Sequence, residues 1–210
     1  MKEILEFLSQ TYRKLTREVM TYVLQNCDER VVSKGEVLLE QGKVCRHVWF
    51  IKKGVLAAHQ EDLQNPEKKS INWFMQEGDI ATSVISFFDE EPSNEKVVAV
   101  EASVVFQMSR KDLFAGIEAY QVLAILTLLV VIRYYVDTRF NEACFRMKNY
   151  HLIYERLLAR CPELVQRVLE RDMALFLGVS EPVFRDIKSG KYKKKKEDGV
   201  RAEKPKPKKK

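Results

Sequence analysis

Residues that carry catalysis or bind metals are few and scattered in this 210-residue chain. The four cysteines never show Cys-x-x-Cys spacing, and the three histidines are equally dispersed. We interpret the cysteines as free thiols of a reducing cytoplasm. No nucleophile, base and orienting group lie close together in the sequence, so it supports no enzyme hypothesis. We also expect no cofactor and no metal.

Long apolar runs are missing as well. The longest, from Val122 to Ile132, stops at Arg133 and is too short for a membrane-spanning helix. Lys2 and Glu3 interrupt any apolar N-terminal region, so we expect no signal peptide. The sequence therefore predicts a cytoplasmic protein without a membrane partner, in which the apolar run is a buried helix.

Basic residues are in excess only at the C-terminal end. Residues 188–210 carry a net charge of +9, whereas the other 187 residues carry −3. The terminal stretch "KSGKYKKKKEDGVRAEKPKPKKK" has almost no apolar residues, which predicts a disordered basic tail over 193–210. We expect this tail to be the first part of the protein to meet a polyanion.

The spacing of apolar residues changes along the chain. Up to about residue 28 it follows the helical period of three and four. From about 30 to 108, short β-rich runs separated by turns predict a small antiparallel barrel or roll. These runs are "EVLLE", "HVWFIKKG", "VLAAH", "SINWFM", "KVVAVEA" and "VVFQM". Ser109 can then cap a new helix together with Asp112, and the pattern stays helical up to about residue 188.

A long helix is expected from about 121 to 147. Its apolar residues follow a heptad-like stripe, broken by Arg133: Val122, Leu126, Leu129, Val136, Phe140, Ala143 and Met147. A helix of this length usually lies between two domains or two subunits. Packing against its own roll would explain the apolar first half, but not the stripe that continues to Met147. We therefore predict a dimerisation helix.

Residues 173–188, "MALFLGVSEPVFRDIK", predict two short helices joined by a tight turn. Gly178 is suited to end the first helix, because glycine tolerates positive φ. Ser180 can cap the second helix, and Pro182 is acceptable in its first turn. This pattern is typical of a DNA-binding helix-turn-helix.

In this order, six segments resemble the Crp/Fnr family of transcription regulators: "KGEVLLEQG" (34–42), "WFIKKG" (49–54), "EGD" (77–79), "MSRKDL" (108–113), "ERLL" (155–158) and "LGVSEPVFRDI" (177–187). The resemblance covers roughly residues 20–190. It implies an α+β fold with an N-terminal helix, an antiparallel β-roll of double-stranded β-helix or jelly-roll type, a long dimerisation helix and a C-terminal, winged helix-turn-helix. Little sequence remains after Ile187 for a two-stranded wing.

The domain boundaries follow from the same resemblance. Residues 1–120 would form the N-terminal helix and a cyclic-nucleotide-binding-like roll, and 121–147 the dimerisation helix. Residues 148–192 would form the DNA-binding domain, followed by the basic tail over 193–210.

The loop that binds the cyclic phosphate in cAMP-binding members departs here from the family pattern. Thr82-Ser83 stand where the family has Gly-Glu, and Ser93-Asn94 or Lys96-Val97 stand near its Arg-Ser pair. A buried phosphate needs a bidentate cation, and Lys96 offers only a point charge among acidic neighbours. We therefore expect neither cAMP nor cGMP to bind. The loop is then retained for the fold, or it serves an unknown small-molecule effector; the candidate ligand residues are Thr82, Ser83, Ser93, Asn94, Lys96 and Arg133.

Some members of the family sense redox state or oxygen through an N-terminal cysteine cluster or a haem. The sequence gives little support for either. The single Cys27 near the N-terminus excludes a cysteine cluster. Haem ligation by His47, His59 or His151 stays open, although no feature of the sequence favours it.

The second helix of the pair also departs from the family pattern. DNA-reading members often present Arg-Glu…Arg, whereas Glu181, Pro182 and Asp186 stand at these positions here. Arg185 is the side chain that could reach a base, and the lysines would bind phosphates without reading sequence. The candidate DNA contacts are Ser180, Glu181, Arg185, Lys188, Lys191, Lys193, Lys194, Lys195 and Lys196.

The favoured interpretation is a homodimeric, sequence-specific DNA-binding transcription regulator of Crp/Fnr type that does not respond to cAMP. Its partners would be double-stranded DNA, a second copy of the chain and, further, RNA polymerase. The alternative is a signal-sensing or protein-interaction module whose helix-turn-helix no longer reads DNA, and an enzyme is a distant third. The second helix of the pair separates the first two, since its polar face is altered while the residues that pack the two helices together are kept: Ala174, Leu177, Val179, Phe184 and Ile187.

Overall fold

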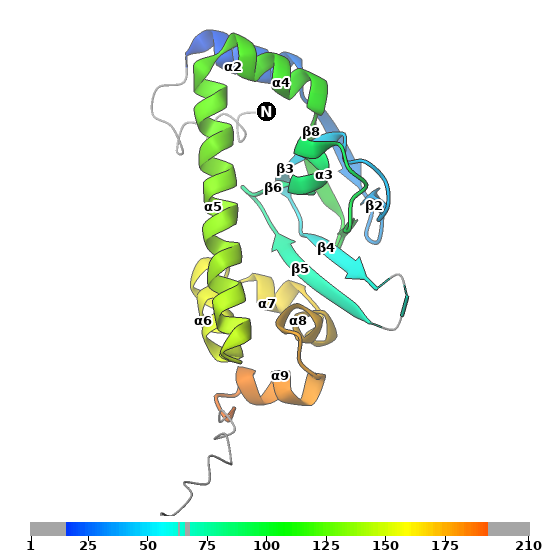
Figure 1. Ribbon diagram of the computed structural model, residues 1–210, viewed down its shortest axis with the longest axis vertical. Coiled ribbons are helices and arrows are strands. Elements are labelled where there is room, and N and C mark those ends of the chain that lie inside the picture. The colour runs from blue at the N-terminus through cyan, green and yellow to red at the C-terminus, as the bar shows by residue number, and fades with distance from the viewer. Residues whose placement is uncertain (1–15, 63, 66–67, 193–210) are drawn as a thin grey trace, which may run out of the picture.

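The computed structural model describes residues 16–62, 64–65 and 68–192 (Figure 1). The chain runs from a helix through a β-roll and a long helix to a group of C-terminal helices, so the α+β fold expected from the sequence is confirmed. The expectations for residues 1–15 and for the tail over 193–210 lie outside the described residues.

In the described part of the chain, the strands form two antiparallel four-stranded sheets. One sheet has the order β1 (Asp28–Val32), β8 (Ser103–Ser109), β3 (His47–Lys53), β6 (Ile80–Ala81). The other has the order β2 (Val37–Leu39), β7 (Lys96–Ala99), β4 (Leu56–Glu61), β5 (Lys69–Met75). Each of the six β-rich runs contains an observed strand, and the sequence pattern missed only β1 and the two-residue β6.

The core of the roll lies between the two sheets. Trp49, Ile51, Leu56, Phe87 and Val105 are fully buried there. Strand β8 is buried on both faces, because Val105 points into this core while its neighbour Phe106 belongs to a second apolar cluster. The short helix α3 (Val84–Asp89) supplies Phe87 to the same core.

A second apolar cluster joins the roll to the helices at the N-terminal side. It contains Val19 and Val23 of α2 (Arg17–Gln25), Phe106 of β8, and Leu123 and Leu126 of α5 (Gln121–Arg146). Helix α4 (Arg110–Ala119) connects β8 to α5. The predicted cap of α4 is confirmed: the Ser109 hydroxyl accepts a hydrogen bond from the backbone N–H of Asp112 at 3.1 Å.

The long helix α5 has two different buried faces. Leu123 and Leu126 are buried against the roll side, whereas Cys144 and the partly buried Phe140 pack with the C-terminal helices. The expected stripe is therefore not one surface. Apolar side chains in the middle of the helix stay exposed, namely Leu128, Leu129, Ile132, Tyr135 and Val136. The expectation that the run from Val122 to Ile132 is a buried helix was therefore wrong, because only Leu123 and Leu126 of this run are buried.

Length and composition alone do not separate α5 from a membrane span. Its 26 residues contain an 18-residue window with a mean hydropathy of 1.5, of which 11% is buried. The expectation that this segment is too short to span a membrane considered only the uninterrupted apolar run from Val122 to Ile132. It was wrong, because the whole helix is long enough. A single helix of this kind is weak evidence for a membrane, and Asp137 on it forms ion pairs with Arg156 and Arg160.

The described chain ends in a group of C-terminal helices: α6 (Tyr150–Arg160), α7 (Leu164–Arg167), α8 (Glu170–Leu177) and α9 (Glu181–Lys188). Helix α8 packs against β5, and α6 and α9 pack against α8 and against each other. Ile71 and Phe74 of β5 belong to one apolar cluster with Met173 and Phe176 of α8. The rings of Phe74 and Phe176 have centroids 5.5 Å apart. We call this cluster, which joins the roll to the C-terminal helices, the shared core.

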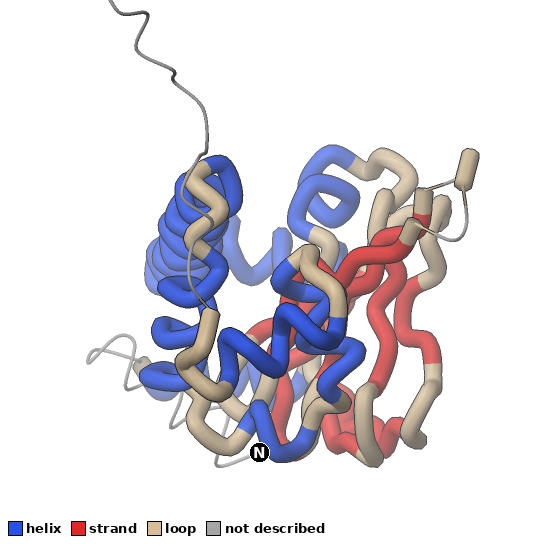
Figure 2. Tube along the Cα trace, turned by 90° about the horizontal axis from the view of Figure 1, so that it is seen from below, coloured by secondary structure: helices blue, strands red, loops and turns tan. Residues whose placement is uncertain are grey.

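The arrangement leaves a helical side and a strand side. Figure 2 shows the strands gathered on one side and α5, seen nearly along its axis, on the other. In Figure 1, α2 and α4 lie at one end of α5 and α9 at the other end.

Candidate ligand cavity and helix-turn-helix surface

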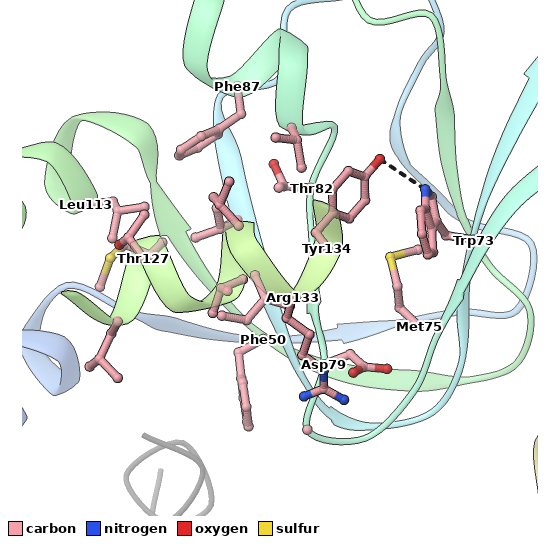
Figure 3. A pocket seen from close by; sticks show the side chains of 18 of the residues that line it. Phe50, Trp73, Met75, Asp79, Thr82, Phe87, Leu113, Thr127, Arg133 and Tyr134 are labelled. Carbon is pink, nitrogen blue, oxygen red and sulfur yellow. Dashed lines mark hydrogen bonds between the residues drawn. The ribbon is translucent and has the colours of Figure 1, made fainter. Parts of the chain in front are cut away.

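A cavity of about 200 Å³ lies between the roll and α5 (Figure 3). Its wall is mainly apolar, and its side chains come from both bodies: Phe50, Trp73 and Phe87 from the roll, and Leu126, Val130 and Tyr134 from α5. The roll and the long helix thus enclose a site that neither could form alone.

Trp73 and Tyr134 close one side of the cavity. The Trp73 indole N–H donates a hydrogen bond to the Tyr134 hydroxyl at 3.0 Å, and the ring centroids lie 4.7 Å apart. Burial raises the pKa of Tyr134 to about 12, so its hydroxyl is neutral at physiological pH. This wall is therefore polar at one oxygen but carries no charge.

The charged side chains of the cavity lie on its rim. Arg160 of α6 donates hydrogen bonds of 2.8 Å to both Asp79 and Asp137. Asp137 also accepts a 2.6 Å bond from Arg156. Arg133 differs, since no carboxylate of the described chain lies within 4 Å of its guanidinium. Arg133, labelled in Figure 3, is thus an exposed cation of the described cavity lining that takes part in no ion pair.

The structure divides the predicted ligand residues into two groups. Thr82 and Arg133 line the cavity, whereas Ser83, Ser93, Asn94 and Lys96 do not. The Thr82 hydroxyl is itself bonded, donating to the His47 carbonyl at 3.2 Å. Asn94 is exposed to solvent.

Ser83 and Ser93, two of the predicted ligand residues, are hydrogen-bonded to each other. Both are buried, and the Ser93 hydroxyl lies 2.9 Å from the Ser83 hydroxyl. Ser93 is further bonded to the backbone of Glu95. No guanidinium takes part in these contacts, so the arrangement lacks the bidentate group that a cyclic phosphate needs.

The surroundings of these serines are acidic. The Glu95 side chain is only 7% exposed and accepts a 2.8 Å hydrogen bond from Asn72. Burial raises the pKa of Glu95, because the charged carboxylate is poorly solvated there. Lys96 lies 3.5 Å from the Glu61 carboxylate and is held by it. An anion would therefore meet a carboxyl group and an already paired lysine.

The candidate haem and metal ligands do not come together. None of His47, His59 and His151 lines the cavity, and His151 pairs with Glu155 at 3.0 Å. Cys27 does line it, but burial raises its thiol pKa to about 11, so the thiol stays protonated. Across the described ranges, no group of three or more His, Cys, Asp or Glu side chains is placed to hold a metal.

Helices α8 and α9 form the predicted pair with a tight turn. Gly178 ends α8 in the left-handed conformation, with φ of 64°. Leu177, Phe184 and Ile187 are fully buried between the helices and the shared core, as the sequence indicated. Ser180 precedes α9 with an extended backbone, but its hydroxyl caps nothing. Only its carbonyl is used, accepting from the Phe184 N–H at 2.9 Å.

The cations of α9 are paired with carboxylates. Arg185 bonds to Glu170 at 3.2 Å and to Glu181 at 3.4 Å. Lys188 bonds to the other oxygen of Glu170 at 2.8 Å. Hydrogen bonds from Lys188 and Arg185 lower the pKa of Glu170, and that of Lys188 is raised in return. Sequence reasoning missed Glu170, whose position in the first turn of the preceding helix was the available signal.

The structure describes only some of the remaining candidate DNA contacts. Ser180, Glu181 and Lys191 are exposed. Lys193, Lys194, Lys195 and Lys196 lie outside the described residues. Between α9 and residue 192 the described chain forms no strand, which agrees with the little sequence available for a wing.

Comparisons with known proteins agree with this architecture. Residues 29–120 match the family model of the cyclic nucleotide-binding domain. FixK2 from Bradyrhizobium japonicum superposes with a TM-score of 0.65 at 12% identity, covering 78% of this chain and 83% of that one. CLP from Xanthomonas campestris gives 0.63 at 12% identity, covering 83% and 91%. The Thermus thermophilus catabolite activator protein gives 0.53 at 17% identity, covering 86% and 85%.

A search of curated protein sequences gives no match. In the described part of the chain, a β-roll that matches the cyclic nucleotide-binding domain model is joined by a long helix to C-terminal helices. The particular arrangement is the Crp/Fnr-like fold, as the sequence resemblance predicted.

Proposed function

We propose that the protein is a cytoplasmic, homodimeric transcription regulator of Crp/Fnr type that binds double-stranded DNA and catalyses no reaction. The observation that carries the proposal is the α8–α9 pair, which keeps its buried core while α9 lies at the end of the molecule remote from α2 (Figure 1). CLP, which has a similar fold, is described as a c-di-GMP-responsive global regulator.

DNA binding would use the exposed face of α9 and the lysines after it. Arg185 and Lys188 are bonded to Glu170, but these side chains are exposed, and such pairs contribute little free energy. Phosphates or a guanine edge can therefore replace the carboxylate as partner. Lys191 and the basic tail would add affinity that does not depend on sequence.

Dimerisation would use the exposed apolar face of α5. Ile132 and Val136, one turn apart, are 47% and 50% exposed, and Leu128 and Leu129 lie one turn before Ile132. A two-fold axis along this face would bury the same side chains on both copies. It would also place the two α9 helices for half-sites about one DNA turn apart.

The proposed regulator would not respond to cAMP or cGMP. The mutually bonded Ser83 and Ser93 and the buried Glu95 support this view, since they offer an anion neither a cation nor free donors. The effector, if the roll binds one, would be of another chemical class.

The second candidate function is a protein-interaction module that no longer reads DNA. Neutralisation of Arg185 and Lys188 by Glu170 and Glu181 favours it, because the described face of α9 then has little positive charge to offer.

Selection of binding sites from random duplex DNA by the purified full-length protein separates the two functions. We expect an enriched sequence with two-fold symmetry. On that sequence Arg185→Ala should cost roughly 1–3 kcal/mol, with little effect on random DNA. Arg171→Ala, on the exposed side of α8, serves as the control and should change neither. No enriched sequence, together with equal weakening of all duplexes by Arg185→Ala, would support the module.

A further inference from the structure

We propose that the cavity between the roll and α5 binds a small apolar monocarboxylate, whose carboxylate pairs with Arg133. The inference names an effector class for the proposed regulator and in that sense rests on the proposed function. The cavity contains no residue of the α8–α9 pair, so ligand binding can be tested without DNA.

The wall and the size of the cavity select an apolar body. Phe50, Phe87, Leu126 and Val130 contribute hydrocarbon surface, and burial of such surface is favourable. The volume of about 200 Å³ is somewhat larger than the ~150 Å³ apolar cavity that admits benzene. It is smaller than the roughly 300 Å³ at which pockets for drug-sized ligands begin. A substituted benzene ring or a medium-length alkyl chain matches this space.

The charges on the rim select an anionic head group. Arg160 is already paired, with Asp79 on one terminal nitrogen and Asp137 on the other, each at 2.8 Å. Arg133, three residues after Val130 on the same helix, has no carboxylate within 4 Å in the described chain. A planar carboxylate matches the two-pronged geometry of a guanidinium, and hydrogen bonds between charged partners are the stronger ones.

The place of the cavity argues against a phosphate ester as ligand. Its wall excludes Ser83, Ser93 and Lys96, the residues that stand at the phosphate-binding positions of the family. One free cation also matches a single negative charge better than a doubly charged group. The neutral Tyr134 hydroxyl and the protonated Cys27 thiol add no further charge to the wall.

Titration of the full-length protein with octanoate, followed by calorimetry and by the fluorescence of Trp73 in the wall, tests the proposal. We expect saturable binding of one octanoate per chain. Octanamide, which has the same chain without the charge, should bind at least about tenfold more weakly. Arg133→Gln should weaken octanoate binding about ten- to a hundredfold, the range for a hydrogen bond to a charged group.

Two further variants make the result specific to the site. Arg146→Gln removes an exposed arginine from the last turn of the same helix and should leave octanoate binding unchanged. Val130→Trp fills the cavity and should abolish binding of octanoate and octanamide alike. Circular dichroism of each variant shows whether the fold is retained.

Several outcomes would overturn the proposal: no binding of octanoate at millimolar concentration, equal binding of octanamide, or unchanged affinity in Arg133→Gln. Failure of the proposed function gives a different result, since octanoate would still bind while no DNA sequence is enriched. Conversely, an enriched DNA sequence without octanoate binding would support the proposed regulator and refute only the proposed effector class.

Discussion

The Arg185 Nε atom on α9 lies 3.2 Å from a carboxylate oxygen of Glu170 on α8, so the two helices of the turn are joined by an ion pair. Lys188 uses the second oxygen of the same carboxylate. One glutamate thus neutralises both α9 cations that we expect to meet DNA. Because all three side chains are exposed, the contact can be removed with little cost to stability.

Glu170→Gln should raise the affinity for duplex DNA several-fold, because Arg185 and Lys188 then lose their shared carboxylate. The salt dependence should steepen, by about 0.9 in the slope of log K for each additional phosphate contact. Fluorescence anisotropy at several salt concentrations measures both quantities. Glu163→Gln, which removes an exposed carboxylate before α7, is the control. Equal affinity of Glu170→Gln and the unmodified protein would show that these cations do not contact DNA.

Val136→Glu should dissociate the dimer, because it would place an unpaired charge in the buried two-fold interface proposed for α5. Its side chain is 50% exposed in the single chain, so the monomer should remain folded. Light scattering at micromolar concentration gives the mass. Leu152→Glu changes an exposed apolar residue of α6 instead and should leave the dimer intact. A monomeric mass for the unmodified protein would refute the interface.

Phe140 belongs to the stripe predicted for the dimerisation helix, but Phe140→Glu would be a poor test of the interface. Phe140 is partly buried in the shared core, and the Arg156 guanidinium lies 4.1 Å from its ring centroid. A glutamate there should lower the free energy of unfolding of each single chain, so loss of the dimer would carry no information about the interface.

Lys96→Arg should not create a site for cAMP, although it introduces a guanidinium near the family's arginine position. The new side chain would still face Glu61, and the buried Glu95 and the Ser83–Ser93 pair would remain. Calorimetry with cAMP and cGMP should show no binding for the unmodified protein or for the variant. Micromolar affinity of the unmodified protein for either nucleotide would contradict the expectation.

The stability of the protein should fall in acid through Glu77. Arg167 of α7 donates two 2.8 Å hydrogen bonds to this carboxylate, which lowers the pKa of Glu77 from 4.5 to about 2. The folded state therefore binds this proton more weakly than the unfolded state does. The stabilisation is fully present above about pH 4.5 and is lost as the pH falls toward 2.

Arg167→Gln should remove this part of the acid dependence. Because the Glu77 side chain is 39% exposed, we expect a loss of about 1 kcal/mol at pH 7, well below what the full shift would imply. Urea unfolding between pH 2 and 7 measures the difference. Arg171→Gln removes a more exposed arginine and should leave the profile unchanged. Parallel profiles for Arg167→Gln and the unmodified protein would show that the contact does not contribute.

Local signals in the sequence predicted the elements well. The Ser109–Asp112 cap, the glycine that ends α8 and the six β-rich runs each depend on neighbouring residues, and each is confirmed. The buried positions of the helix pair, such as Phe184 and Ile187, followed for the same reason.

Contacts between distant segments could not be predicted in this way. The stripe on α5 assumed one partner along the whole helix, whereas the roll covers its beginning and the C-terminal helices its end. Arg167 and Glu77 are 90 residues apart, and nothing near either residue points to the other. The cavity was missed because its wall is assembled from several strands and helices, of which the sequence marked only Thr82 and Arg133.

The shared core also bears on how the chain unfolds. Ile71 and Phe74 of the roll lie in the same apolar cluster as Met173 and Phe176 of the helix pair. Neither part can lose its structure without exposing the hydrocarbon surface of the other to water. The roll and the C-terminal helices should therefore melt in one cooperative transition. A fragment that ends at the long helix would present the bare face of β5 as a surface prone to aggregation.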